Sequence, residues 1–336
     1  MNDNAEKLVL DAAYQPQVRT NVDTTRIMLT VIIALLPEVA ACFFQYGSYP
    51  LLVIAVSVAS CVFFEWGYRK LMKKSCTIGD LSAVVTGILL AMVLPANVPL
   101  WMPVIGAFFS IVVVKQLYGG IGKNFLNPAL AGRAFLQASY AYYMGIGATP
   151  KGLSMFVDAT TMATPLSYLY GGGTLPEYYS KLNLFIGNRP GSIGDISILA
   201  ILIGASVLLA CKVINWRVPA ATLGTVAALT LIFGKSGYGN VDWMVYNLLS
   251  GGLMLGAFFM ATDYATSPVT YKGKLLYGFG IGALTVLIRY FGGYPDGISY
   301  AILIMNLCSW AIDKAFRRRP FGSTNEAPAT VKEAVK

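Results

Sequence analysis

Residues 27–46 read IMLTVIIALLPEVAACFFQY, a run of twenty residues that contains one charged side chain, Glu38. About 20 apolar residues in a helix cross the hydrocarbon core of a bilayer, which is about 30 Å thick. An ionisable group at membrane depth is costly and is therefore a functional candidate. The stretch predicts a membrane-spanning helix, and the acid that follows Pro37 is its candidate functional group.

The same apolar pattern repeats along the 336 residues of the chain, of which 56% are apolar or aromatic and 12% are charged. Soluble domains carry about 25% charged residues, so a water-soluble globule is excluded. We predict an all-α polytopic membrane protein of about ten transmembrane helices. The predicted spans are 27–46, 50–67, 79–95, 99–117, 125–144, 195–214, 218–234, 244–261, 275–291 and 298–315.

Asn127, Pro128 and Arg133 interrupt the fifth apolar run, so the number of spans could be nine or ten. The positions of the basic residues decide between these two counts. With ten alternating spans and a cytoplasmic N-terminus, 19 of the 25 Lys and Arg residues fall on the cytoplasmic side. Cytoplasmic loops carry the excess of basic residues, whereas nine spans would place the arginines at 317–319 outside. The five basic residues on the outer side are Lys151, Lys181, Arg189, Lys235 and Arg289.

This topology divides the chain into five parts. They are a cytoplasmic N-terminal segment (1–26), a first membrane half of five helices (27–144), an outer loop (145–194), a second membrane half of five helices (195–316) and a cytoplasmic tail (317–336). The polar N-terminal segment lacks a short apolar region with a cleavage site, so we expect no removable signal peptide. We predict a multi-pass protein of the bacterial cytoplasmic (inner) membrane with both termini in the cytoplasm.

The two halves also share a short pattern. Lys115 precedes Tyr118-Gly119-Gly120, and Arg289 precedes Phe291-Gly292-Gly293. Because five spans per half is an odd number, the second half would enter the membrane from the opposite side. We therefore predict two inverted five-helix repeats, an arrangement familiar from transporters.

The composition excludes several kinds of chemistry. The chain has no histidine, so histidine-ligated haem, histidine metal sites and histidine base catalysis are excluded. No two cysteines have C-x-x-C spacing, so no iron–sulfur or zinc site is predicted, and we expect all five cysteines to pack in the core. The net charge of +9 is explained by membrane topology, and no nucleic-acid partner is expected. The cysteines are Cys42, Cys61, Cys76, Cys211 and Cys308.

The outer loop contains the run Phe156-Val-Asp-Ala-Thr-Thr-Met-Ala-Thr-Pro-Leu166. Taken alone, an Asp followed by hydroxyl residues and Pro is also an ordinary helix cap or turn. The run resembles the D-x-x-[S/T]-x-A-T acceptor motif, at which a dedicated transferase joins FMN to a threonine through a phosphoester. Asp158, Thr161, Ala163 and Thr164 match the motif, whereas Met162 stands where Gly is frequent. The resemblance makes Thr164 the attachment residue.

Two further runs carry a resemblance across nearly the whole chain. Residues 118–133 read YGGIGKNFLNPALAGR, and residues 257–268 read AFFMATDYATSP. They resemble segments shared by the D subunit of the Rnf electron-transport complex and the B subunit of the sodium-pumping NADH:quinone oxidoreductase. The chain is thus identified as a member of the RnfD/NqrB family, and its length resembles that of the D subunits.

This resemblance implies a membrane flavoprotein subunit of an ion-translocating ferredoxin:NAD oxidoreductase, inactive alone and with no catalytic side chain or metal of its own. Electrons would pass between covalent FMN on Thr164 and a non-covalent riboflavin near Asn124 and Asn127, coupled to Na⁺ or H⁺ transport. The asparagines could equally cap a helix-start turn. The implied partners are the A, B, C, E and G subunits of the Rnf complex, an outer-side flavin transferase and membrane lipid.

Acidic residues within the spans are candidates for ion coupling. Glu38 is the deepest of them, and it could instead bond to an interrupted neighbouring helix. Asp263 stands beside Thr262 and Thr266, where a polar pocket or a helix-end cap would both fit. Glu65, Asp80 and Asp313 fall near predicted helix ends and are expected at the solvated interface.

Two other functions also fit ten helices. An inverted repeat with broken spans is what a solute or ion transporter without redox activity would need. A purely structural membrane subunit with a degenerate flavin motif is the third alternative. Neither alternative needs a bound flavin, so flavin binding distinguishes the electron carrier from both of them.

Overall fold

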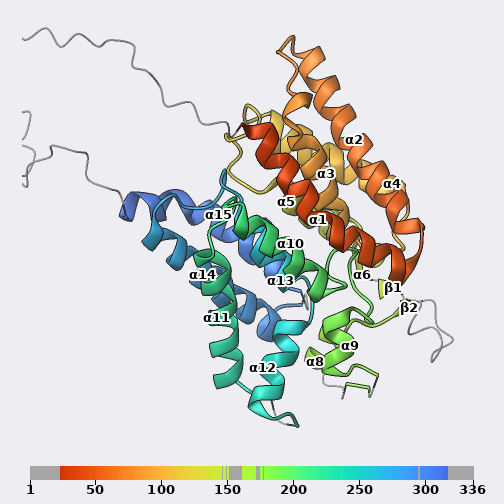
Figure 1. The fold of residues 1–336 in the computed structure, drawn as a ribbon, viewed down its shortest axis with the longest axis vertical. Coiled ribbons are helices and arrows are strands. Elements are labelled where there is room, and N and C mark those ends of the chain that lie inside the picture. The colour runs from red at the N-terminus through yellow and green to blue at the C-terminus, as the bar shows by residue number, and fades with distance from the viewer. Residues whose placement is uncertain are drawn as a thin grey trace, which may run out of the picture.

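The computed structural model describes residues 23–145, 147–148, 150, 161–171, 175–176, 178–235, 237–293 and 296–316. Regular structure in these ranges is almost entirely helical, which confirms the predicted all-α polytopic class. The exceptions are β1 (Gly147–Ala148) and β2 (Thr161–Met162), which pair as a two-residue antiparallel ladder. Each of the ten predicted spans contains a helix (Figure 1).

The first half begins with two long helices and continues with shorter ones. In order they are α1 (Thr24–Tyr46), α2 (Tyr49–Leu71), the 3₁₀ turn η1 (Ile78–Asp80), α3 (Ser82–Met92), α4 (Trp101–Phe108), the π-helix η2 (Phe109–Gln116), α5 (Pro128–Ser139) and α6 (Ala141–Gly145). Two short helices follow β2, namely α8 (Pro165–Tyr170) and α9 (Lys181–Ile186).

The second half begins with shorter helices and ends with two long ones. Its elements are α10 (Ile198–Ala210), α11 (Arg217–Ile232), α12 (Asn240–Leu249), α13 (Leu253–Leu255), the π-helix η3 (Gly256–Met260), α14 (Tyr271–Phe291) and α15 (Ile298–Ala315). Within the described ranges, α1, α2 and α14 are each long and apolar enough to cross a membrane, and α12 with α13–η3 forms a fourth candidate that is bent by 67°.

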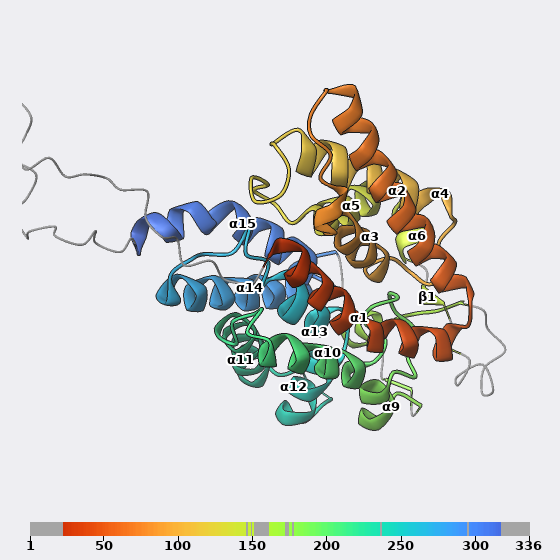
Figure 2. The ribbon, with the colours of Figure 1, turned by 45° about the horizontal axis from the view of Figure 1, so that its top comes forward.

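Some of the helix contacts correspond between the two halves. In the first half α2 packs against α3 and α4, and in the second half α11 packs against α12 and α14. Among the described residues, α1 packs against α10 and α5 packs against α15, and each of these pairs joins the two halves through helices five spans apart. Figures 1 and 2 show α1 alongside α10, with the remaining helices of each half gathered on its own side. This packing supports the predicted repeat.

The third span is broken rather than continuous. Helix α3 has 11 residues, about 17 Å of helix at 1.5 Å per residue. The backbone that follows pairs with the segment before α10: the amide of Ile193 donates to Leu94 at 2.9 Å, and that of Gly194 donates to Met92 at 2.7 Å. Irregular backbone is tolerated at membrane depth where protein satisfies its polar groups. The segment just before α10 thus supplies the partners for the break in the third span.

Arg189 and Arg289, which the sequence assigns to the outer side, are each only 2% exposed and donate to backbone carbonyls. Two other sequence predictions about individual residues are wrong. Glu65 is fully buried rather than solvated. Of the cysteines, Cys42 and Cys61 are buried as expected, whereas three are exposed: Cys76 in the loop before η1, Cys211 at the end of α10, and Cys308 on α15.

Candidate functional site

Two cavities lie at opposite ends of α3 and α10. We call them the Thr164 cavity, about 330 Å³, and the Asn124 cavity, about 260 Å³, after one wall residue of each. Ligand pockets start at about 300 Å³, so the Thr164 cavity reaches that size and the Asn124 cavity is slightly smaller. The walls of the two cavities come close together along α3 and α5. Leu89 and Ala129 line the Asn124 cavity, and Val93 and Arg133, each four residues further along, line the Thr164 cavity.

The Asn124 cavity brings together three of the predicted site residues. Asn124 and Asn127 come from the first half and Asp263 comes from the second. Apolar side chains form most of the remaining wall, and the polar groups are few, which is the usual character of a cofactor pocket. The apolar and aromatic wall residues include Met28, Val85, Leu89, Phe259 and Tyr264.

The loop between η2 and α5 needs its glycines. Gly119, Gly120 and Gly122 have φ values of 111°, 96° and 79°, which residues with a Cβ rarely adopt. This backbone brings Asn124, 6% exposed, into the cavity wall, where its Nδ2 donates to the carbonyl of Leu126 at 3.0 Å. Among the described residues the side-chain oxygen of Asn124 accepts no hydrogen bond, so it can accept one from a ligand.

Asn127 has a structural role that the sequence left open. Its Oδ1 accepts from the amides of Ala129 and Leu130 and so caps α5, and Pro128 follows as the first helical residue. Its Nδ2 donates to the carbonyl of Met260 in the second half at 3.4 Å. The interruption predicted in the fifth span is therefore the start of α5, and the amide of Asn127 is occupied by protein.

We expect Asn127→Ala to lower stability by about 1–2 kcal/mol, because it removes an N-cap and a bond between the halves. Asn127→Ser keeps a capping oxygen and should lose less. Thermal unfolding of the detergent-purified chain measures both. An alanine variant as stable as the wild type would show that the cap contributes nothing.

Asp263 follows the π-helix η3 and faces the same cavity. Its carboxylate accepts from the amide of Ala265 at 3.3 Å and from the hydroxyl of Thr266 at 3.4 Å. The residue therefore caps this turn and also lines the cavity.

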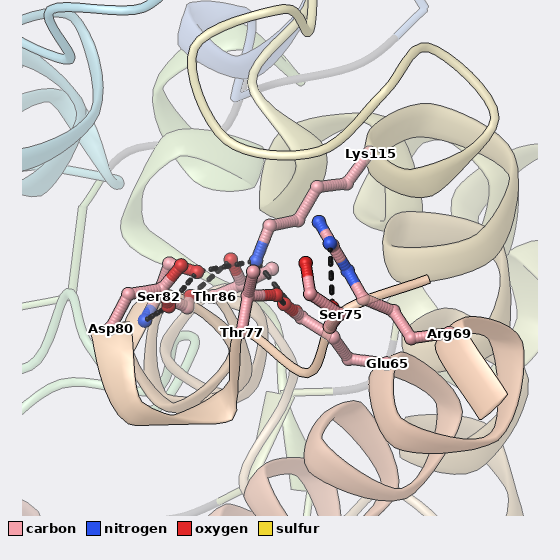
Figure 3. Close-up of polar contacts among 8 residues, drawn as sticks. All are labelled: Glu65, Arg69, Ser75, Thr77, Asp80, Ser82, Thr86 and Lys115. Atoms are coloured by element: carbon pink, nitrogen blue, oxygen red, sulfur yellow. Dashed lines mark hydrogen bonds and ion pairs between the residues drawn. The ribbon is translucent and has the colours of Figure 1, made fainter. Parts of the chain in front are cut away.

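An ion pair that the sequence did not predict also reaches this cavity. Lys115 at the end of η2 and Ser82 at the start of α3 line it, and the Lys115 ammonium lies 2.7 Å from the Glu65 carboxylate (Figure 3). Three distant segments meet here, so no local pattern announces the pair. The one available signal was an acid and a base inside apolar runs, a costly placement unless they are paired.

The Thr164 cavity holds the predicted attachment residue. Thr164 is half-buried, caps α8 by accepting from the amide of Ser167 at 3.3 Å, and lies 2.9 Å from the Ser167 hydroxyl. Ala163 precedes it, and its carbonyl accepts from Tyr179. The cap anticipated for this sequence is thus present, and Thr164 also lines the cavity. Asp158 lies outside the described residues, as does the side chain of Thr161.

Four charged residues of the described ranges line the Thr164 cavity, namely Arg133, Arg189, Asp195 and Asp296. Arg133 on α5 donates to Asp296 at 3.1 Å and to Ser299 at 2.6 Å, so it joins the halves. Glu38, 2% exposed, accepts from the amide of Ser197 at the start of α10. This is the bond to an interrupted helix that the sequence offered as the alternative to ion coupling, and the second carboxylate oxygen has no partner among the described residues.

The chain matches known proteins over nearly its full length. The family model described as the NQR2, RnfD, RnfE family matches residues 11–322. The D subunit of a Na⁺-translocating ferredoxin:NAD⁺ oxidoreductase complex from Acetobacterium woodii is 45% identical, over 95% of this chain and 97% of the relative. The D subunit of a proton-translocating ferredoxin:NAD⁺ oxidoreductase complex from Clostridium ljungdahlii is 39% identical, over 95% and 98%. The D subunit of an ion-translocating oxidoreductase complex from Actinobacillus succinogenes is 34% identical, over 91% and 96%.

Proposed function

Because the chain belongs to the NQR2, RnfD, RnfE family, we propose that it is the flavin-carrying membrane subunit of an ion-translocating ferredoxin:NAD⁺ oxidoreductase complex. At the coarser level, the chain is a membrane subunit of a redox-driven translocase and acts with the other subunits of the Rnf complex. A transporter without redox activity does not explain this membership, and flavin content distinguishes the proposal from a purely structural subunit.

The observation that carries the proposal is the closeness of the two cavities. Leu89 and Val93 line different cavities, and so do Ala129 and Arg133. Each pair is one helical turn apart, about 6 Å along the helix axis. A flavin on Thr164 and a second flavin, riboflavin, in the Asn124 cavity would therefore be neighbours, as electron transfer requires.

The residues of each cavity fit their group. Thr164 offers a hydroxyl for a phosphoester, made by an external flavin transferase, which leaves it an anchor and not a reactant. In the Asn124 cavity, apolar walls would hold a flat ring, while Asn124 and the Lys115 ammonium would meet its polar edge. Bound flavin supplies one- or two-electron transfer, and the protein sets its potential through hydrogen bonds and charge. The chain would lie in the inner membrane with Thr164 on the outer side.

Ion coupling belongs to the same proposal. Of the relatives named above, the two most similar carry different ions in their names. Sequence similarity to them therefore does not identify the coupling ion as Na⁺ or as H⁺. We assign coupling roles to Asp263 in one cavity and to Glu38 near the other, because buried carboxylates can exchange a cation or a proton.

The test is the flavin content of the purified full chain co-produced with an active transferase. We expect two flavins per chain, one retained by the acid-denatured protein and one released. Asn124→Leu should lose most of the released flavin and keep the retained one, because it removes the polar group without emptying the Thr164 cavity. Asn183→Leu, which removes an amide in α9 bonded to the carbonyl of Tyr178, is the matched control and should keep both. Absence of released flavin from the wild type would refute the second site.

A further inference from the structure

A buried cation forms part of the wall of the Asn124 cavity. The side chains of Lys115 and Glu65 are 3% and 1% exposed, and their charged atoms lie 2.7 Å apart. Moving such ions out of water costs several kcal/mol each, and this is offset only where geometry and further hydrogen bonds are good. Apolar side chains at these two positions would avoid this cost, so the presence of a buried ion pair indicates a function beyond stability.

The surrounding groups hold both charges in place. The Lys115 ammonium donates to the Ser82 hydroxyl at 2.6 Å, and that hydroxyl donates to Asp80 at 2.6 Å. Thr77 donates to the other oxygen of Glu65 at 2.7 Å. Figure 3 shows the ammonium between Glu65 and Ser82. Both oxygens of the carboxylate are thus engaged.

The ammonium still has capacity for a ligand. An ammonium has three N–H groups and no acceptor, and among the described residues Lys115 donates to two partners. Lys115 and Ser82 both line the Asn124 cavity, whereas Glu65 stands behind them. Lys115 also belongs to the π-helix η2, and π-helical turns occur frequently at functional sites.

We propose that Lys115 is the counter-charge for the electrons held in the Asn124 cavity, and that Glu65 is the positioning residue that fixes and partly offsets it. The inference rests on the proposed second flavin and adds what sets its potential. A flavin ring gains negative charge when it accepts electrons without as many protons. In a site of low dielectric constant a fixed ammonium stabilises that charge strongly.

The two members of the pair must then have opposite effects. Lys115→Met removes the cation, so the flavin should become harder to reduce. Glu65→Gln removes the anion that offsets the cation, so the flavin should become easier to reduce. Damage to the fold would not produce shifts of opposite sign, which separates this role from a merely structural one.

The experiment is potentiometric titration of the acid-releasable flavin in the full chain purified in detergent. For Lys115→Met we expect the equilibrium between reduced and oxidised flavin to move at least tenfold toward the oxidised form, about 30 mV more negative for a two-electron couple. Glu65→Gln should shift the potential in the positive direction. Lys115→Arg, which keeps the cation, and the doubly neutral Glu65→Gln/Lys115→Met should lie between these extremes. The flavin on Thr164 is the internal control and should shift least.

Unchanged potentials, or shifts of the same sign in Lys115→Met and Glu65→Gln, would overturn the inference while leaving the second flavin site intact. If Lys115→Met retains no flavin, Glu65→Gln decides alone, and an unchanged or more negative potential overturns the inference. A wild-type chain without any releasable flavin is a different result, because it refutes the proposed second site itself.

Discussion

Replacing Thr164 by valine is expected to abolish the covalent flavin completely. Valine has nearly the shape of threonine and lacks the hydroxyl that would carry the phosphoester. The measurement is in-gel flavin fluorescence of the denatured chain after co-production with a transferase that is shown to be active on another substrate. A fluorescent wild-type band that is absent from Thr164→Val would establish the attachment.

Thr164 also caps α8, so control variants must distinguish the loss of the attachment hydroxyl from the loss of the helix cap. Losing a cap costs about 1 kcal/mol, and a lower yield from that cause says nothing about the chemistry. Thr164→Asn keeps a capping oxygen and should be dark, whereas Thr164→Ser keeps a hydroxyl and should retain fluorescence. Ser167→Ala removes the neighbouring hydroxyl, 2.9 Å away, and should also fluoresce. A fluorescent Thr164→Asn variant would move the attachment to another residue.

The sequence predicted the fold class because apolar length and charge placement are local properties. Each predicted span contains a helix, since a run such as 27–46 leaves the backbone no partner in lipid except its own carbonyls. The break after α3 was not predictable from its own residues. Its polar groups are satisfied by residues 193–194, about a hundred positions away.

The candidate site likewise has some features that the local sequence predicts and others that depend on distant parts of the chain. The glycines before Asn124 and the helix start at Asn127 are readable locally, and the structure places both asparagines beside Asp263. The ion pair of Lys115 is not readable in this way, because a position near a helix end indicates solvent for Glu65. Burial depends on what packs against that end, and here η1 and the start of α3 cover it.

The largest effect on stability is expected from Gly204→Leu, at the crossing of α10 with α1. A Cβ at Gly204 would clash with the backbone oxygen of Ala34 and would lie 3.0 Å from the ring of Phe259. Backbone cannot move aside as a flexible side chain can, and overpacking a tight site costs about 3 kcal/mol. Small residues permit such close approach between membrane helices. We therefore expect Gly204→Leu to lower the thermal midpoint in detergent sharply, or to prevent recovery of folded chain.

Gly224→Leu is the matched control, because Gly224 also lies within a helix, α11, and a Cβ there would meet nothing within 4 Å. Leucine has a higher helix propensity than glycine by nearly 1 kcal/mol, so this variant should be as stable as the wild type or slightly more so. The crossing of α1 with α10 joins the two halves, and loosening it should also weaken the bond from Ser197 to Glu38. If Gly204→Leu and Gly224→Leu unfold at the same temperature, the close contact between the halves does not hold the protein together.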